Sequence, residues 1–183
     1  MGDSTYKMFF AGSGGQGVLL MGQIVGSAAI LEEKEATFFP SYGPEMRGGT
    51  ANCTVIVSDR AISSPLISES DSVVAMTLPS MLKFEPTLKP GGTLLLNKSI
   101  IQQAPKRSDI TVFEVPATEL ANELGNPRVA NMIMLGAFVR ATGCVSTGSV
   151  EHVIREVFGV KKAELVDLEL MAYGYWAASQ PSN

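Results

Sequence analysis

Six residues near the amino terminus constrain the fold of this 183-residue chain more than any other feature. They are Gly12, Ser13, Gly14, Gly15, Gln16 and Gly17, and they follow a short apolar run at residues 6–11 that is typical of a strand. Behind them, apolar side chains recur at helical spacing over residues 18–29. A G-x-G-x-x-G turn between a strand and a helix presents backbone N–H groups at the positive helix end, which suits an anion. The alternative is that the glycines only permit a sharp turn and close packing.

The later patterns predict an α/β fold. Strand patterns lie at residues 36–39, 50–58, 72–77, 93–96 and 111–115, and helix patterns at residues 79–88, 117–124, 128–142, 150–158 and 163–178. This alternation predicts a mainly parallel sheet flanked by helices on both faces, with a Rossmann-like start and a helical C-terminal third. The length favours a single domain over residues 1–183.

Two glycines four residues apart, Gly22 and Gly26, interrupt the first predicted helix. Each costs about 1 kcal/mol of helix propensity relative to alanine. We therefore expect another part of the molecule to approach this helix closely. A neighbouring strand or helix is the simpler candidate, and another subunit is the alternative.

The glycine loop by itself also fits a free-standing nucleotide-binding oxidoreductase or sensor, which would bind NAD(P) or flavin. A dinucleotide site of this kind needs an acidic residue at the end of the second strand, to hold the ribose hydroxyls. Here Phe38-Phe39-Pro40-Ser41 occupies that place, and Glu32, Glu33 and Glu35 come too early. This function is therefore the second candidate.

A second glycine- and proline-rich motif follows the same strand. It reads Ser41-Tyr42-Gly43-Pro44-Glu45-Met46-Arg47-Gly48-Gly49. Its glycines and proline favour turns, so that Glu45 and Arg47 are presented on a constrained loop. The planar guanidinium of Arg47 matches a phosphate or a carboxylate. The alternative is a surface loop in which Glu45 and Arg47 pair with each other.

These two motifs, followed by Thr50-Ala-Asn-Cys, together resemble the gamma subunit, or the matching fused domain, of 2-oxoacid:ferredoxin oxidoreductases. Ser64-Pro65, Leu88-Lys-Pro-Gly-Gly92 and Asn126-Pro-Arg-Val-Ala-Asn-Met132 are also similar to these subunits. The resemblance thus covers nearly the whole chain as one pyruvate/ketoisovalerate oxidoreductase gamma-type domain. The form of the second motif is most similar to subunits associated with 2-oxoglutarate, then branched-chain 2-oxoacids, then pyruvate.

The resemblance implies a role inside a larger enzyme. The family cleaves a 2-oxoacid with thiamine diphosphate, passes electrons through iron–sulfur clusters to ferredoxin, and transfers the acyl group to coenzyme A. Alpha, beta and possibly delta subunits would be the partners that hold these cofactors, and ferredoxin would be reached only indirectly. The present chain would hold no cofactor alone, carry no catalytic or metal residue, and be inactive when isolated.

Two groups of residues receive candidate roles from this resemblance. The loop Gly12, Ser13, Gly14, Gly15, Gln16 and Gly17 would cradle the pyrophosphate of coenzyme A, with Arg47 holding a phosphate or a partner loop. The remaining second-motif residues would form the partner interface: Tyr42, Pro44, Glu45, Met46, Gly48 and Gly49.

Composition excludes several other roles. The formal net charge of −4 provides no basic field for a nucleic-acid backbone. The most apolar stretch, residues 129–139, is shorter than the roughly 20 residues of a membrane span. Cys53 and Cys144 form neither a disulfide framework nor a ligand pair, so we expect reducing cytoplasm and buried thiols. His152 lacks a nucleophile partner and is expected to be a solvated helix residue.

Overall fold

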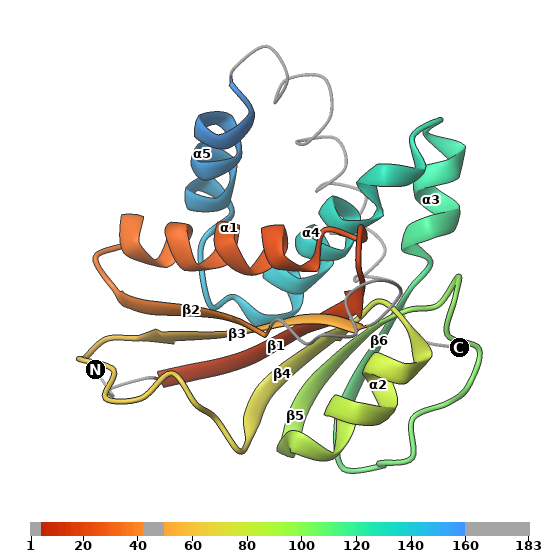
Figure 1. Cartoon of the computed structure of the whole chain (residues 1–183), viewed down its shortest axis with the longest axis horizontal. Coiled ribbons are helices and arrows are strands. Elements are labelled where there is room, and N and C mark those ends of the chain that lie inside the picture. The colour runs from red at the N-terminus through yellow and green to blue at the C-terminus, as the bar shows by residue number, and fades with distance from the viewer. Residues whose placement is uncertain (1–4, 42–49, 160–183) are drawn as a thin grey trace.

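The computed structural model describes residues 5–41 and 50–159 (Figure 1). The predicted helix at residues 163–178 and most of the second motif lie outside these residues. The described strands are β1 (Thr5–Ser13), β2 (Glu35–Ser41), β3 (Thr50–Ser58), β4 (Ser70–Ala75), β5 (Leu88–Asn97) and β6 (Thr111–Val115). The helices are α1 (Val18–Leu31), α2 (Leu78–Phe84), α3 (Ala117–Glu123), α4 (Ala130–Thr142) and α5 (Thr147–Phe158), with the 3-10 turns η1 (Glu85–Thr87) and η2 (Pro127–Val129).

The strands form one six-stranded sheet in the order β2-β3-β1-β4-β5-β6. The pairs β1–β4, β4–β5 and β5–β6 are parallel, whereas β3 is antiparallel to both β1 and β2. The predicted mainly parallel α/β sheet is thus confirmed, with one difference. The sequence pattern predicts that β2 lies next to β1, as in a β-α-β unit. In the structure β3 lies between them, because it runs antiparallel to β2 and pairs with β1 along its other edge.

Two adjacent phenylalanines in β1 show how the sheet is covered on both faces. Side chains alternate along a strand, so Phe9 and Phe10 point to opposite sides. Phe10 packs edge-on against Phe138 of α4 at 5.1 Å between ring centroids, and Phe9 packs against Phe84 of α2 at 4.6 Å. Figure 1 shows α1, α4 and α5 over the first face and α2 over the other. The two faces therefore carry separate apolar clusters.

Helix α1 lies close to the sheet because Gly22 has no side chain. A Cβ at this position would stand 2.5 Å from Cys53 Sγ, 3.1 Å from Val55 Cγ2 and 3.2 Å from Phe38 Cε2. These three side chains belong to β3 and β2, so the close neighbour of this part of the helix is the sheet of the same chain. The simpler of the two interpretations is confirmed at Gly22.

Some element boundaries differ from the sequence patterns at prolines and glycines. The helix expected at residues 79–88 ends at Phe84 and continues as the 3-10 turn η1 around Pro86. Strand β5 begins at Leu88, earlier than expected, with a bulge between the pairs Ser70–Leu88 and Ser72–Thr93. Proline limits the helix because its ring clashes with the preceding turn, and Gly91, with φ +76°, permits the bulge.

Candidate functional site

The glycine loop joins β1 to α1 at the carboxyl end of the parallel strands. Strand β1 ends at Ser13, whose carbonyl accepts a hydrogen bond from the Gln16 N–H at 3.2 Å, closing a four-residue turn. Within this loop Gly15 has φ +89° and Gly17 has φ +71°. L-residues with side chains rarely adopt these values, so the glycines at both positions are needed for the turn itself.

Gln16 and Gly12 stabilise the turn through contacts within the loop. The Gln16 side-chain oxygen Oε1 accepts a hydrogen bond from the Ser13 backbone N–H at 2.7 Å. A Cβ on Gly12 would lie 2.6 Å from that oxygen and 2.9 Å from Cβ of Met76, which follows β4. Gly12 and Gln16 therefore shape the loop, while Gly14 and Gly15 are exposed at its tip.

The amino end of α1 has no capping side chain and no acidic residue of its own. Its N-cap residue is Gly17, which offers no side-chain cap, and its first turn contains no acidic residue. The first N–H groups of a helix have no partner within the helix, and together with the helix dipole they attract negative charge. This end of α1 can therefore accept an anion through backbone N–H groups.

Asn131 in the first turn of α4 completes this site, and sequence reasoning did not identify it as a binding residue. It is only 6% exposed, and its carboxamide faces Gly17: a Cβ there would lie 2.9 Å from Asn131 Cγ. Among the described residues no group hydrogen-bonds to this carboxamide. The carboxamide is not among the fully enclosed polar groups that lack a partner, which are Thr37 Oγ1 and Ser72 Oγ in the described residues. It therefore remains accessible beside the loop, where it can contact a bound ligand.

One signal in the sequence pointed to Asn131. It is a polar residue inside the otherwise apolar run 129–139, and it also belongs to the segment 126–132 that carries part of the family resemblance. Its contact with the glycine loop, 114 positions earlier, depends on the packing of α4 beside α1. A sequence pattern does not contain that packing.

The second motif begins and ends beside the glycine loop. Ser41, the last residue of β2, pairs with Asn52, and Thr50, the first residue of β3, pairs with Ser13. Residues 42–49 therefore connect two points at the same end of the sheet as the loop. The candidate residues Tyr42, Pro44, Glu45, Met46, Arg47, Gly48 and Gly49 lie outside the described residues, so their roles stay predictions.

The remaining candidates have structural roles. Cys53 is fully buried beneath α1, and burial raises the pKa of its thiol to about 12. Burial also raises the pKa of the Cys144 thiol. His152 is exposed on α5, 3.5 Å from Glu156 one turn later. Cys53 is thus buried as expected and His152 is solvated as expected, whereas Cys144 is only partly buried.

The described ranges contain no cluster of histidine, cysteine, aspartate and glutamate that could hold a metal ion. Nor do they contain a helix long and apolar enough to cross a membrane. What the loop and Asn131 provide is a set of hydrogen-bond donors at a positive helix end. Chemically, this arrangement can bind and orient an anionic group.

Known proteins are similar to this chain in sequence and in fold. A family model described as pyruvate ferredoxin/flavodoxin oxidoreductase matches residues 7–175. The 2-oxoglutarate synthase subunit KorC of Methanothermobacter marburgensis is 41% identical over 152 residues, covering 79% of this chain and 82% of that subunit. The subunit of the same name from Methanocaldococcus jannaschii is 36% identical over 173 residues, covering 93% and 92%.

Solved structures agree with these sequence relatives. The gamma subunit of a keto/oxoacid ferredoxin oxidoreductase from Geobacter sulfurreducens has a TM-score of 0.82 at 32% identity, covering 94% of this chain and 98% of that one. The 2-oxoglutarate:ferredoxin oxidoreductase of Magnetococcus marinus reaches a TM-score of 0.87 over 97% of this chain and 32% of its own. At 21% identity, that likeness shows the fold alone. The match over most of its length shows that this chain belongs to the pyruvate ferredoxin/flavodoxin oxidoreductase family.

Proposed function

We propose that this chain is the gamma subunit of a 2-oxoacid:ferredoxin oxidoreductase, that the substrate is 2-oxoglutarate, and that the isolated chain is inactive. The relatives named 2-oxoglutarate synthase subunit KorC support the substrate, because they match along most of both chains. The Geobacter gamma subunit supports the subunit role, since it is covered almost completely by this one chain.

In this proposal the chain works in a cytoplasmic complex whose other subunits hold the redox and thiamine cofactors. A cubane iron–sulfur cluster takes four thiolates, and this chain has two cysteines. Its residues therefore do not fit such a cluster, and the clusters and the thiamine diphosphate belong to the alpha, beta and possibly delta subunits. Ferredoxin would then receive electrons from those partners and have no direct contact with this chain.

Within this complex, the glycine loop binds a phosphate of coenzyme A. The observation that carries this proposal is the position of the Asn131 carboxamide, which stays accessible and faces Gly17 at the uncapped amino end of α1. Backbone N–H groups of the loop and the Asn131 amide would donate hydrogen bonds to phosphate oxygens. The chain would bind and orient the acyl acceptor without moving a proton itself. Arg47 would add a guanidinium to the same phosphate or hold a partner loop.

The structure gives no support to the alternative of a free-standing dinucleotide enzyme. In a Rossmann dinucleotide site, the strand that carries the ribose-binding acid lies next to β1. Here β3 separates β2 from β1, and β2 ends in Phe39, Pro40 and Ser41. An acidic partner for a ribose is therefore missing both from the expected position in the sequence and from the neighbouring strand.

The proposal is tested by measuring coenzyme A affinity of the assembled complex with Asn131→Asp. This change keeps the size of the side chain but replaces a donor by a negative charge beside the bound phosphate. A hydrogen bond to a charged group contributes about 1.5–3 kcal/mol, so we expect coenzyme A to bind at least about tenfold more weakly. Asn122→Asp, an exposed change of the same kind on α3, is the control.

Two further variants separate the parts of the site. Arg47→Ala and Gly14→Ala should each weaken coenzyme A binding if the guanidinium and the exposed loop tip both contact the phosphate. Complexes must contain all subunits in normal amounts, so that assembly defects are not read as binding defects. Wild-type affinity in a fully assembled Asn131→Asp complex would show that the loop is only a structural turn.

A further inference from the structure

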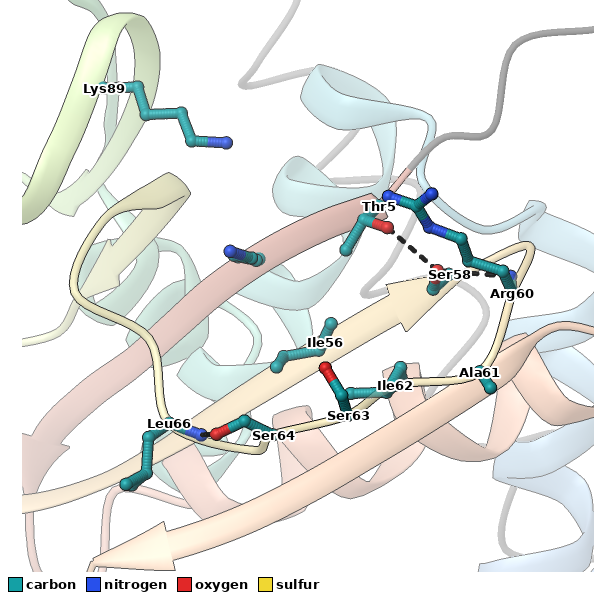
Figure 2. A pocket seen from close by; sticks show the side chains of 11 residues that line it. Thr5, Ile56, Ser58, Arg60, Ala61, Ile62, Ser63, Ser64, Leu66 and Lys89 are labelled. Carbon is teal, nitrogen blue, oxygen red and sulfur yellow. Dashed lines mark hydrogen bonds between the residues drawn. The ribbon is translucent and has the colours of Figure 1, made fainter.

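A polar cavity lies at the end of β1 opposite to the glycine loop, near the amino ends of the parallel strands. It has a volume of about 320 Å³ and is bounded by β1, β3, the start of β5 and the loop at residues 59–69 (Figure 2). The buried side chain of Ile56 lies along it, and the sequence patterns assigned no function to this region. The nine residues of β1 separate it from the glycine loop.

The cavity concentrates positive charge in a chain whose formal net charge is −4. Its lining includes Lys7, Arg60 and Lys89 and contains no aspartate or glutamate. Like charges near one another repel, so such a grouping is costly unless anions compensate it. The sign of this lining is therefore opposite to that of the whole chain.

Among the described residues, Lys89 has a carboxylate partner and the Lys7 ammonium does not. Asp71 accepts a hydrogen bond from Lys89 Nζ at 2.9 Å with one oxygen and from the Lys7 backbone N–H at 2.7 Å with the other. Each oxygen of this carboxylate thus accepts a hydrogen bond from a donor other than the Lys7 ammonium. No carboxylate in the described ranges lies within ion-pair distance of Lys7 Nζ.

Serine and threonine hydroxyl groups shape the wall formed by residues 59–69. Ser58 Oγ lies 2.9 Å from Thr5 Oγ1 and accepts a hydrogen bond from the Arg60 N–H at 3.2 Å. Ser64 Oγ accepts one from the Leu66 N–H at 3.2 Å, which turns the loop back toward the sheet (Figure 2). The cavity is consequently a built feature of the fold, with hydroxyl groups beside its cations.

We propose that this cavity binds the phosphate group of a small organic molecule, at a site separate from the glycine loop. Ammonium and guanidinium groups with neighbouring hydroxyls are the donors that phosphate oxygens prefer. The volume is at the lower end of the range for small-molecule sites, which suits a phosphate on a compact organic body. The phosphate could belong to a free phosphorylated metabolite or to coenzyme A, and the experiment distinguishes these sources.

The test measures the affinity of the assembled complex for inorganic phosphate by isothermal titration calorimetry, at constant ionic strength set with chloride. All measurements use an Asn131→Asp background, which disables the proposed glycine-loop site. Lys7→Gln should weaken phosphate binding by roughly tenfold or more, since it removes a charge-assisted hydrogen bond. Lys7→Arg should retain most of the affinity. Lys83→Gln, which removes an exposed lysine on α2, is the matched control.

A second titration identifies the source of the phosphate. If coenzyme A displaces phosphate in the Asn131→Asp background, the cavity takes a coenzyme A phosphate, and if it does not, the ligand is another phosphate ester. The proposal would be overturned if Lys7→Gln and Lys83→Gln lowered the phosphate affinity equally, or if no phosphate binding were measured above the chloride background. Should Lys7→Gln prevent assembly, Lys89→Gln removes a cation from the same cavity and decides the question.

Discussion

Replacement of Gly22 by alanine tests whether α1 is held as close to the sheet as the structure shows. In an exposed helix the same change would stabilise the protein, because glycine costs about 1 kcal/mol relative to alanine. Here the added methyl group would meet Cys53 Sγ at 2.5 Å and have two further carbon contacts at 3.1 and 3.2 Å. Real Cβ atoms do not approach other atoms to 2.5 Å, so Cys53 or the helix must move.

The two effects can be compared in magnitude. Overfilling a packed core costs about 1–3 kcal/mol. Cys53 cannot easily swing away, since its side chain is fully buried and its Sγ lies 3.7 Å from the Val18 carbonyl oxygen. Subtracting the gain of about 1 kcal/mol in helix propensity leaves a net effect between neutral and a destabilisation of about 2 kcal/mol. For a protein of this length, each kcal/mol corresponds to a fall in Tm of about 2–4 °C.

Urea and thermal unfolding of the full chain, followed by far-ultraviolet circular dichroism, measure this effect. Gly26→Ala is the matched control: in the described part of the chain no atom lies within 4 Å of its added Cβ, so it should stabilise by about 1 kcal/mol. Cys53→Ala combined with Gly22→Ala should recover part of the loss, with a favourable coupling of about 1 kcal/mol. A Gly22→Ala chain stabilised by about 1 kcal/mol, as expected for Gly26→Ala, would refute the close packing of α1.

Three titratable groups give pH predictions. Burial alone would raise the pKa of Glu32, but hydrogen bonds from Lys34 and Ser146 outweigh it and lower this pKa from an ordinary 4.5 to about 2. The ionised Glu32 therefore stabilises the folded state above pH 4.5, and this stabilisation is lost as the pH falls toward 2. Glu32→Gln should therefore cost about 1 kcal/mol in urea unfolding at pH 7 and nothing near pH 2. Burial raises the pKa values of Cys53 and Tyr6 to about 12, from ordinary values of 9.0 and 10.0. The folded state should therefore lose stability as the pH rises from 9 toward 12. A urea midpoint that stays constant over this pH range would contradict the prediction. The same burial should protect Cys53 from iodoacetamide at pH 8 until urea is added, as mass spectrometry would detect.

Local patterns were sufficient to predict most elements of the fold. The alternating residues 50–58 and 111–115 match β3 and β6 along their full lengths, because each is a run of β-branched and apolar residues between clear turn signals. The local sequence patterns did not predict the order of the strands in the sheet. Nothing local in residues 35–58 shows that β3 pairs with β1 as well as with β2, since that pairing joins residues 37 to 53 positions apart.

The candidate site was predictable only in its local part. The strand–turn–helix geometry of the glycine loop follows from its own residues, because the positive φ angles of Gly15 and Gly17 are local requirements. Asn131 and the cavity around Lys7 depend on distant segments meeting. Asn131 reaches the loop through the packing of α4, and Lys7, Arg60 and Lys89 come from three parts of the chain.

The antiparallel strand explains why the two sequence motifs belong to one site. Had β2 and β3 both run parallel to β1, the chain after Ser41 would have had to cross the sheet before starting β3 at its other end. Because β3 runs antiparallel, it starts where β1 and β2 end, with Thr50 beside Ser13 and Asn52 beside Ser41. The short segment 42–49 is therefore anchored at both ends next to the glycine loop. A partner subunit that contacted this segment would also lie beside the proposed phosphate site, so subunit assembly and coenzyme A binding should depend on the same end of the sheet.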